Sequence, residues 1–210
     1  MELSAGADEP VYARTDEDGR VTPGGCERDY NVKWDGVTLT LRNAYITGGY
    51  ETTPDFTKGI YFKGSLDLVL IGTNTVTRTD EAQAYYHVTG ISVGSDLSIT
   101  GSGNTSRLII GGSDAAKYGS DGIDAGSSLY IKDCVVQANG HGEIEPGYTG
   151  ICAKDELVIE NNTVTAASTG FGCGINLSYG DIRIDEASHA RPRLRPRAGP
   201  SSFRNTARST

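Results

Sequence analysis

Apolar residues recur along the chain in short pieces that share one inner pattern. In four pieces a Gly-Ile pair is followed by aliphatic residues six and eight positions after the Ile. These pieces are Gly59-Ile60 with Leu66 and Leu68, Gly90-Ile91 with Leu97 and Ile99, Gly122-Ile123 with Leu129 and Ile131, and Gly150-Ile151 with Leu157 and Ile159. A fifth, Gly174-Ile175 with Ile182 and Ile184, is one residue longer. The starts lie 31, 32, 28 and 24 residues apart, which predicts a solenoid of stacked units joined by loops of variable length.

The spacing inside each piece predicts a β-strand with one apolar face. Alternation with period two puts both aliphatic side chains on the same side of an extended chain. The residues between them are Asp67, Ser98, Tyr130 and Val158. We expect these four outside, and the five repeat Ile residues stacked in an internal column because each coil must pair with its neighbours. The Gly before each Ile is expected at a corner, since glycine reaches backbone angles that other residues avoid.

Further strand signals complete each coil. An apolar residue or pair follows every aliphatic piece, at Ile46, Val76, Leu108 with Ile110, Val135 with Val136, and Val164. An earlier, degenerate coil is expected at residues 37–41, after Trp34-Asp35-Gly36. Runs rich in Thr, Val, Ile and Leu bounded by Gly, Asn and Asp predict strands, and no stretch shows the period of an amphipathic helix. The fold class is therefore all-β, with about three short strands in each of about six coils.

Composition divides the chain into three parts. Residues 34–186 carry the repeats, and the 28 Gly and single Met of the whole chain suit one elongated β domain. Residues 1–33 are polar and are expected to form an irregular lead-in or cap. Residues 187–210 hold six Arg and no acid, with Pro between the Arg residues, and this composition predicts a disordered tail. A foreign end replacing further coils, a basic arm and an ordinary linker remain alternatives for the tail.

Charge excludes some partners. Without the tail, the remaining residues hold 13 Lys plus Arg against 27 Asp plus Glu, a balance of −14. Nucleic acid and anionic membranes are bound through basic patches, so neither is expected as the partner of the solenoid. No apolar run is long enough to cross a membrane, and residues 1–10 have no secretion-signal pattern. We expect a secreted or cell-surface protein whose signal is absent from this sequence, because polar solenoids of this kind are typical of exported bacterial proteins.

The four cysteines stand at Cys26, Cys134, Cys152 and Cys173 without a Cys-x-x-Cys pair. A zinc or thioredoxin-type site therefore has little support. In the repeat alignment Cys152 and Cys173 are offset by three positions, about 10 Å along a strand, which is too far for a disulfide unless the loop folds back. The preferred interpretation is that Cys134 and Cys152 are small buried residues of the stack.

The loops before each Gly-Ile pair carry the candidate binding residues. They recur at the same point of each coil and hold many of the rings of the chain. The candidates are Tyr85, Tyr86, Tyr118, His141, Tyr148 and Phe171. Because coils stack, equivalent loops must lie side by side, and functional residues concentrate on loops that a rigid scaffold holds. We expect one long face of rings, carboxylates and small polar groups, suited to glycans; for any single ring, covering the aliphatic column is the alternative.

Residues 37–185 resemble the right-handed parallel β-helix proteins, the class of pectate-lyase-like folds. Their Gly-Ile, Leu-x-Ile and Thr-Val-Thr repeats are most similar to those of surface and secreted proteins of gut and soil bacteria. Some of these are described as carbohydrate-binding. The resemblance implies the architecture and leaves the activity open, since one fold hosts many functions.

A closer resemblance concerns the polygalacturonases. Their Asp-Gly-Ile-Asp and Gly-His-Gly motifs are similar to Asp121-Gly122-Ile123-Asp124 and Gly140-His141-Gly142. The resemblance would place Asp121 and Asp124 with the catalytic acids and His141 with the supporting histidine. However, no Asp-Asp pair lies between the motifs, and Arg183-Ile184-Asp185 has an acid where the family has Lys. Inverting hydrolysis needs at least two correctly spaced carboxylates, and Gly-Ile-Asp is also what the repeat itself contains.

The lyase alternative would require bound calcium. Asp114, Asp121 and Asp124 could gather around an ion that accepts six to eight oxygens, but the glycine-rich calcium-binding nonapeptide is absent. No metal or other cofactor is therefore expected. The sequence favours a non-catalytic protein, part of a longer one, that binds a polysaccharide or a host or cell-wall glycan. A polysaccharide hydrolase or lyase and a purely structural spacer are the alternatives.

Overall fold

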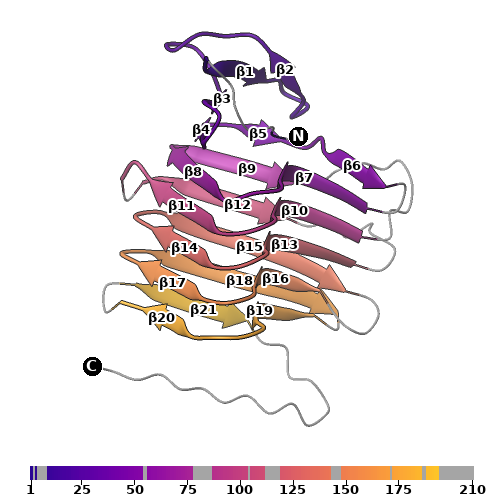
Figure 1. Cartoon of the computed structure of the whole chain (residues 1–210), viewed down its shortest axis with the longest axis vertical. Coiled ribbons are helices and arrows are strands. Elements are labelled where there is room, and N and C mark those ends of the chain that lie inside the picture. Colours follow the sequence, from indigo (N-terminus) through magenta and orange to yellow (C-terminus); the bar gives the residue numbers. More distant parts are fainter. Residues whose placement is uncertain are drawn as a thin grey trace.

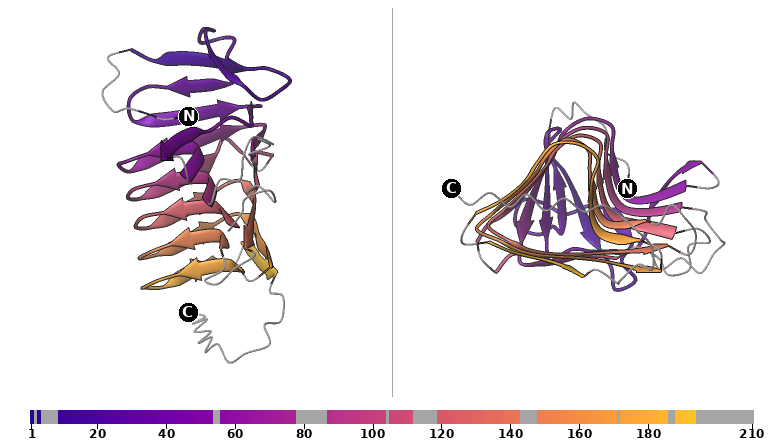
Figure 2. Two further views of the ribbon diagram at one scale, coloured as in Figure 1. Left: turned by 90° about the vertical axis from the view of Figure 1, so that its right-hand side faces the viewer. Right: turned by 90° about the horizontal axis from the view of Figure 1, so that it is seen from below.

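A computed structural model describes residues 1, 3, 9–53, 56–77, 87–103, 105–111, 119–142, 148–170, 172–185 and 188–193. In this part of the chain all regular elements are strands, and no helix is present. The strands wind into a parallel β-solenoid whose turns are stacked along the long axis (Figure 1). Seen along that axis the turns superimpose on a roughly triangular outline (Figure 2). The expected all-β solenoid is confirmed.

Each turn contributes one strand to each of three parallel stacks. The first stack consists of β7 (Phe56–Phe62), β10 (His87–Val93), β13 (Gly119–Ala125), β16 (Thr149–Ala153) and β19 (Cys173–Leu177). The second consists of β4 (Thr38–Arg42), β8 (Leu66–Ile71), β11 (Leu97–Gly101), β14 (Leu129–Lys132), β17 (Leu157–Glu160) and β20 (Ile182–Ile184). The third consists of β5 (Tyr45–Ile46), β9 (Thr73–Thr77), β12 (Arg107–Gly111), β15 (Val135–Gly142), β18 (Thr163–Gly170) and β21 (His189–Arg193). Three strands per coil, as expected from the sequence, are therefore present.

The core is a set of aliphatic columns in register. The repeat Ile residues are direct partners along the first stack, and Ile60, Ile91, Ile123 and Ile151 are fully buried. Along the second stack the aliphatic pair of each repeat aligns in the same way with that of the next. The residues between the pairs, Asp67 and Tyr130 among them, point outward. Both predictions from the period-two pattern are confirmed.

The array has about four full turns rather than about six. A count of six coils requires the segment around Leu39 and the last Gly-Ile copy to be complete coils. Leu39 does pair with Leu68, but β3 (Val32–Trp34) ahead of it runs antiparallel and supplies no first-stack strand. At the other end, β19, β20 and β21 pair on one side only within the described residues. These two layers therefore terminate the array instead of adding full turns.

The repeat glycines do not stand at corners. Each lies inside a first-stack strand, and none of Gly59, Gly90, Gly122 and Gly150 has a positive φ. What they share is lack of space: a Cβ on Gly90 would lie 2.3 Å from Ile110 Cγ2 and 2.7 Å from the Gly122 carbonyl oxygen. The conformational explanation was therefore wrong. Glycine is required because the first stack approaches the third stack and the next turn too closely for a side chain.

Left-handed backbone occurs instead between the second and third strands of a turn. Asn43, Asp133 and Asn161 have φ between 47° and 55°, and Gly72 occupies the equivalent corner with φ of 68°. Asn and Asp tolerate this conformation because their short side chains bond locally. The corner residues of successive turns also bond each other: Asn161 Nδ2 donates to Asp133 Oδ1 at 2.5 Å. This corner therefore carries the turn chemistry of the solenoid.

Near both ends of the described chain, strands form where the sequence predicts none. Three antiparallel strands, β1 (Val11–Thr15), β2 (Val21–Pro23) and β3, extend the second stack, in place of an irregular lead-in. Strand β6 (Tyr50–Thr53) adds antiparallel to β7. Residues 189–193, expected in a tail that excludes a strand, form β21 and pair in parallel with β18. Pro192 is tolerated because β21 lies at an edge, and residues 194–210 lie outside the described residues.

All four cysteines are free thiols. Cys134 is buried, as expected for a residue of the stack, whereas Cys152 is only half-buried. Thr149 and not Cys152 is the strand partner of Cys173, so the three-position offset inferred from the sequence is present. Burial raises the pKa of the Cys134 thiol to about 11.

Candidate functional site

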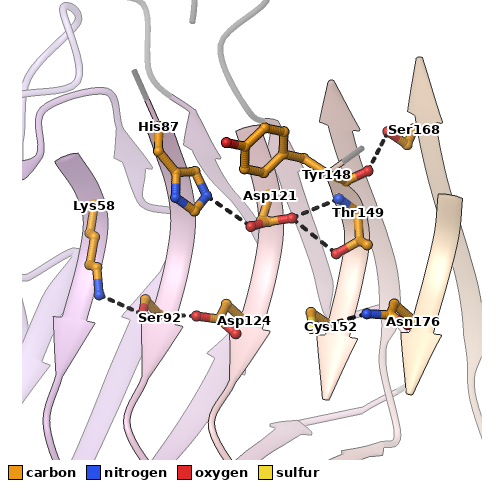
Figure 3. Close-up of polar contacts among 10 residues, drawn as sticks. All are labelled: Lys58, His87, Ser92, Asp121, Asp124, Tyr148, Thr149, Cys152, Ser168 and Asn176. Atoms are coloured by element: carbon orange, nitrogen blue, oxygen red, sulfur yellow. Dashed lines mark hydrogen bonds and ion pairs between the residues drawn. The ribbon is translucent and has the colours of Figure 1, made fainter. Parts of the chain in front are cut away.

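Polar side chains gather on the outward face of the first stack. In the repeat alignment most of them occupy the second position before the Ile or the first position after it, and His87 stands four positions before Ile91. A strict alternation would put these two positions on opposite faces, but they meet: Lys58 Nζ, before Ile60, donates to Ser92 Oγ, after Ile91, at 3.0 Å (Figure 3). The crowded Gly between them interrupts the alternation. We call this group of side chains the polar face; its central residues are Lys58, His87, Ser92, Asp121, Asp124 and Thr149, of which Ser92, Asp121 and Thr149 are buried.

Asp121 is the best-held carboxylate of the polar face. Its Oδ1 accepts from the Thr149 backbone N–H at 2.6 Å and from the Thr149 hydroxyl at 3.0 Å. Its Oδ2 lies 2.9 Å from His87 Nε2 (Figure 3). The residue is only 9% exposed. Both oxygens are therefore engaged, which fixes the orientation of the His87 ring in the way that a carboxylate fixes an acid–base histidine.

Aromatic rings flank His87 on both sides. The Tyr148 ring centroid lies 4.6 Å from that of His87, and Phe56 meets His87 edge-on at 5.4 Å. Tyr148 packs directly on Gly119, whose φ is 151° and where a Cβ would lie 1.8 Å from the ring. Burial, and then the charge of Asp121, raises the pKa of the Tyr148 hydroxyl. The result is a half-buried imidazole between two rings, with Phe56 43% exposed.

A second polar row runs beside the first. Ser92 accepts from Lys58 Nζ and donates to Asp124 Oδ2 at 3.5 Å (Figure 3). The Lys58 ammonium also lies 4.3 Å from the centre of the Tyr61 ring. Burial lowers the pKa of Lys58, and burial followed by the nearby Asp121 charge raises the pKa of Asp124. Burial thus disfavours the charged form of both groups, while the attraction between Lys58 and Asp124 and the Ser92 hydrogen bond to Asp124 oppose that effect.

The second polar row continues to the thiol of Cys152, whose surroundings do not favour a reactive thiolate. Asn176 Nδ2 lies 3.8 Å from Cys152 Sγ. Burial, together with the Asp124 and Asp121 charges, raises the pKa of Cys152 to about 11. A nucleophilic cysteine needs a lowered pKa, so Cys152 fits a lining residue better than a reactive one.

The residues predicted from the sequence divide into three groups. Five lie outside the described residues, namely Tyr85, Tyr86, Asp114, Tyr118 and Phe171. Asp121, Asp124 and Tyr148 lie together at the polar face. His141, which the polygalacturonase resemblance placed near Asp121, is the strand partner of the adjacent Ser120, and its Nδ1 lies 2.7 Å from Thr169 Oγ1 on the next strand. His87 is the histidine that bonds Asp121.

His87, Lys58, Ser92 and Thr149 are not among the candidate residues that the sequence provides. When the repeats are aligned on their Gly-Ile pairs, the sequence does indicate that His87 and Asp121 lie close together. Thr89 aligns with Asp121, so His87 stands two positions earlier on the adjacent strand. That short diagonal is within reach of a carboxylate and an imidazole.

The described residues offer no evident metal site. Across the ranges that the structure describes, no three His, Cys, Asp or Glu side chains gather in a way that would hold a metal ion. In the same ranges, no helix is long and apolar enough to cross a membrane.

Comparison with known proteins returns no relative. No protein-family model matches the chain, and no curated protein or solved structure matches it significantly. The fold and the polar face thus define a parallel β-solenoid with a candidate ligand surface. The function must be argued from that surface itself.

Proposed function

We propose that the protein is an exported, non-catalytic solenoid that binds glycans at the polar face, as a secreted or cell-surface binding or adhesion module. One observation carries the proposal: the His87–Asp121–Thr149 network is rigidly held and flanked by the Phe56 and Tyr148 rings. Sugar C–H faces pack on rings, while sugar hydroxyls exchange hydrogen bonds with a few well-placed polar groups. The repeated strands space these groups at about 4.8 Å, a regular ladder suited to a chain-like ligand.

The charge of the chain is consistent with this ligand class. The formal net charge is −8, which disfavours nucleic acid and anionic membranes. On the polar face, Lys58 and His87 stand beside Asp121 and Asp124. Donors and acceptors are therefore mixed on the same surface, as hydroxyl-rich ligands require.

The proposal is tested by affinity electrophoresis in gels containing polygalacturonate, alginate or mucin glycans. We expect retardation by at least one polymer. Phe56→Ala should weaken it about fivefold, the equivalent of about 1 kcal/mol, because an exposed stacking ring is removed. Tyr130→Ala is the matched control, since its ring is 39% exposed on the second stack. Equal retardation of the two variants, or no retardation by any polymer, refutes the proposal and leaves the structural spacer.

Acid–base cleavage of the bound glycan is a second candidate, favoured by the single observation that Asp121 orients His87. A histidine so held can move a proton in a transition state. The same polymers are incubated with the protein and assayed for new reducing ends and unsaturated products. If the protein cleaves a polymer, and His87→Gln abolishes the cleavage while the polymer still retards the variant in the gel, catalysis is established in addition to binding. Absence of any product with a retarding polymer would dismiss it.

A further inference from the structure

Lys58 presents its amine to a hydroxyl rather than to a carboxylate. The side chain is half-buried on β7, and its Nζ donates to Ser92 Oγ at 3.0 Å (Figure 3). Two other described lysines, Lys33 and Lys132, have carboxylate oxygens as partners, at 3.1 and 3.5 Å. A carboxylate in direct contact holds the proton on an ammonium group, whereas a hydroxyl holds it less firmly. Lys58 is therefore better placed than these two lysines to become a free amine.

A route for the released proton runs from Lys58 to Asp124. Ser92 is 3% exposed and donates to Asp124 Oδ2 at 3.5 Å, so one buried hydroxyl separates the amine from a carboxylate. Burial lowers the pKa of Lys58 and raises the pKa of Asp124, against the attraction between their charges. Passing the proton through Ser92 removes both charges together, and no proton has to reach water.

We propose that Lys58 is a covalent binding site for small aldehydes, which condense with its amine. Asp124 first takes the Lys58 proton through Ser92. The amine nitrogen, activated by desolvation, then adds to the aldehyde carbon, and a proton moves from the nitrogen to the carbonyl oxygen. Asp124 gives its proton to the resulting hydroxyl, which leaves as water while the carbon–nitrogen double bond forms. The nitrogen keeps one positive charge as an iminium, and Asp124 is again a carboxylate.

The contacts of Lys58 suit the product as well as the reactant. The centre of the Tyr61 ring lies 4.3 Å from the Lys58 ammonium, and the face of an aromatic ring attracts a cation. Because the iminium has the same charge at the same nitrogen, the Tyr61 ring and the Asp124 carboxylate stabilise it too. The condensation therefore replaces one cation with another and brings no new charge into a half-buried site. It requires no bound glycan, so it is independent of the proposed function.

The test is reductive trapping on the unmodified chain at pH 7 with glyceraldehyde and cyanoborohydride, whose hydride converts the iminium to a stable secondary amine. Peptide mass spectrometry compares Lys58 with Lys63, an exposed lysine directly after the end of β7. We expect Lys58 to be modified at least about fivefold faster than Lys63, because a desolvated lysine has more free amine. Modification of Lys58 at the same rate as Lys63, or more slowly, overturns the proposal.

A second comparison tests the route through Asp124. The variant Asp124→Asn cannot give a proton to the departing hydroxyl, and it no longer attracts the Lys58 ammonium. Acetylation of Lys58 by acetic anhydride needs only the free amine, so it should be at least as fast in the variant as in the parent. Trapping with glyceraldehyde also needs the acid, so it should slow at least about fivefold at Lys58 and stay unchanged at Lys63. Acetylation of Lys58 that slows, or trapping that does not, overturns the route.

Discussion

The imidazole of His87 and the carboxylate of Asp121 lie 2.9 Å apart although 34 residues separate them in the chain. One turn of the solenoid brings them together, because β10 and β13 are adjacent parallel strands. Their contact is diagonal, with Gly119 directly opposite His87. The Tyr148 ring occupies the space that a side chain at position 119 would fill, and it packs beside the His87 ring. Three successive turns therefore contribute to one small site.

The close packing of the repeat glycines leads to the first prediction. Gly90→Ala should destabilise the fold by about 1–3 kcal/mol, the usual cost of forcing an extra carbon into a packed interior. The new Cβ would meet Ile110 and the Gly122 carbonyl. Gly48→Ala is the control, because nothing lies within 4 Å of a Cβ there. Urea denaturation followed by circular dichroism measures both, and equal midpoints would contradict the packing explanation.

The second prediction concerns the left-handed corner at Asn161, whose φ is 47°. Asn161→Val and Asn161→Gly both lose the side-chain bond to Asp133, so their difference reports on the backbone alone. Valine should be less stable than glycine by about 1–2 kcal/mol, because a side chain branched at Cβ resists this conformation. The free energies of unfolding in urea provide the comparison. A valine variant as stable as the glycine variant would be inconsistent with the described corner.

A third prediction follows from the buried charge of Asp124. Its pKa is raised in the folded protein above the ordinary 3.8, chiefly by burial. The folded state then holds the proton to higher pH than the unfolded state, so stability decreases as pH rises from 3.8 through the folded pKa. Asp124→Asn cannot ionise and should be more stable than the parent at pH 7, with the difference vanishing below pH 3.8. Denaturation midpoints of the parent and of Asp124→Asn, measured from pH 3 to 8, test this. A parent that is more stable than the variant at pH 7 would contradict the prediction.

The fourth prediction is selective thiol labelling. With a pKa of about 11, Cys134 is ionised in only about one molecule in a thousand at pH 8. It is also 2% exposed, whereas Cys26 is exposed. A disulfide reagent at pH 8 should therefore modify Cys26 quickly and Cys134 only after denaturation, as peptide mass spectrometry can determine. Similar native rates at the two positions would show that the stack opens around Cys134.

The repeat spacing predicted the architecture because one constraint dominates it. Every Ile of the Gly-Ile pairs must stack on the next, and a fixed spacing of six and eight residues leaves no other register. The three strands per turn and the outward Asp67 and Tyr130 follow from the same alternation. The number of turns was harder to predict from the sequence. β3 has the composition of a strand, but its antiparallel direction depends on the chain folding back.

The site was only partly predictable. Asp121 and Tyr148 stood out as chemical types, but the contact of Asp121 with His87 depends on register between turns, which the varying loop lengths obscure. Lys58 and Ser92 gave no signal because isolated Lys and Ser residues are ordinary on a β surface. Their contact requires the two outward positions of each strand to meet across the Gly, and that interruption of alternation is a tertiary packing effect.

The glycine positions have a consequence for how such a chain can change. A line of backbone without side chains runs through four successive turns of the solenoid, at Gly59, Gly90, Gly122 and Gly150. Apart from that line, the aliphatic columns and the left-handed corner, the residues differ from turn to turn, and the distance to the next copy ranges from 24 to 32 residues. A whole turn can therefore be gained, lost or exchanged as a unit if it brings its own glycine. The number of turns and the residues on the outer surface can therefore change, while the line of glycines stays the same.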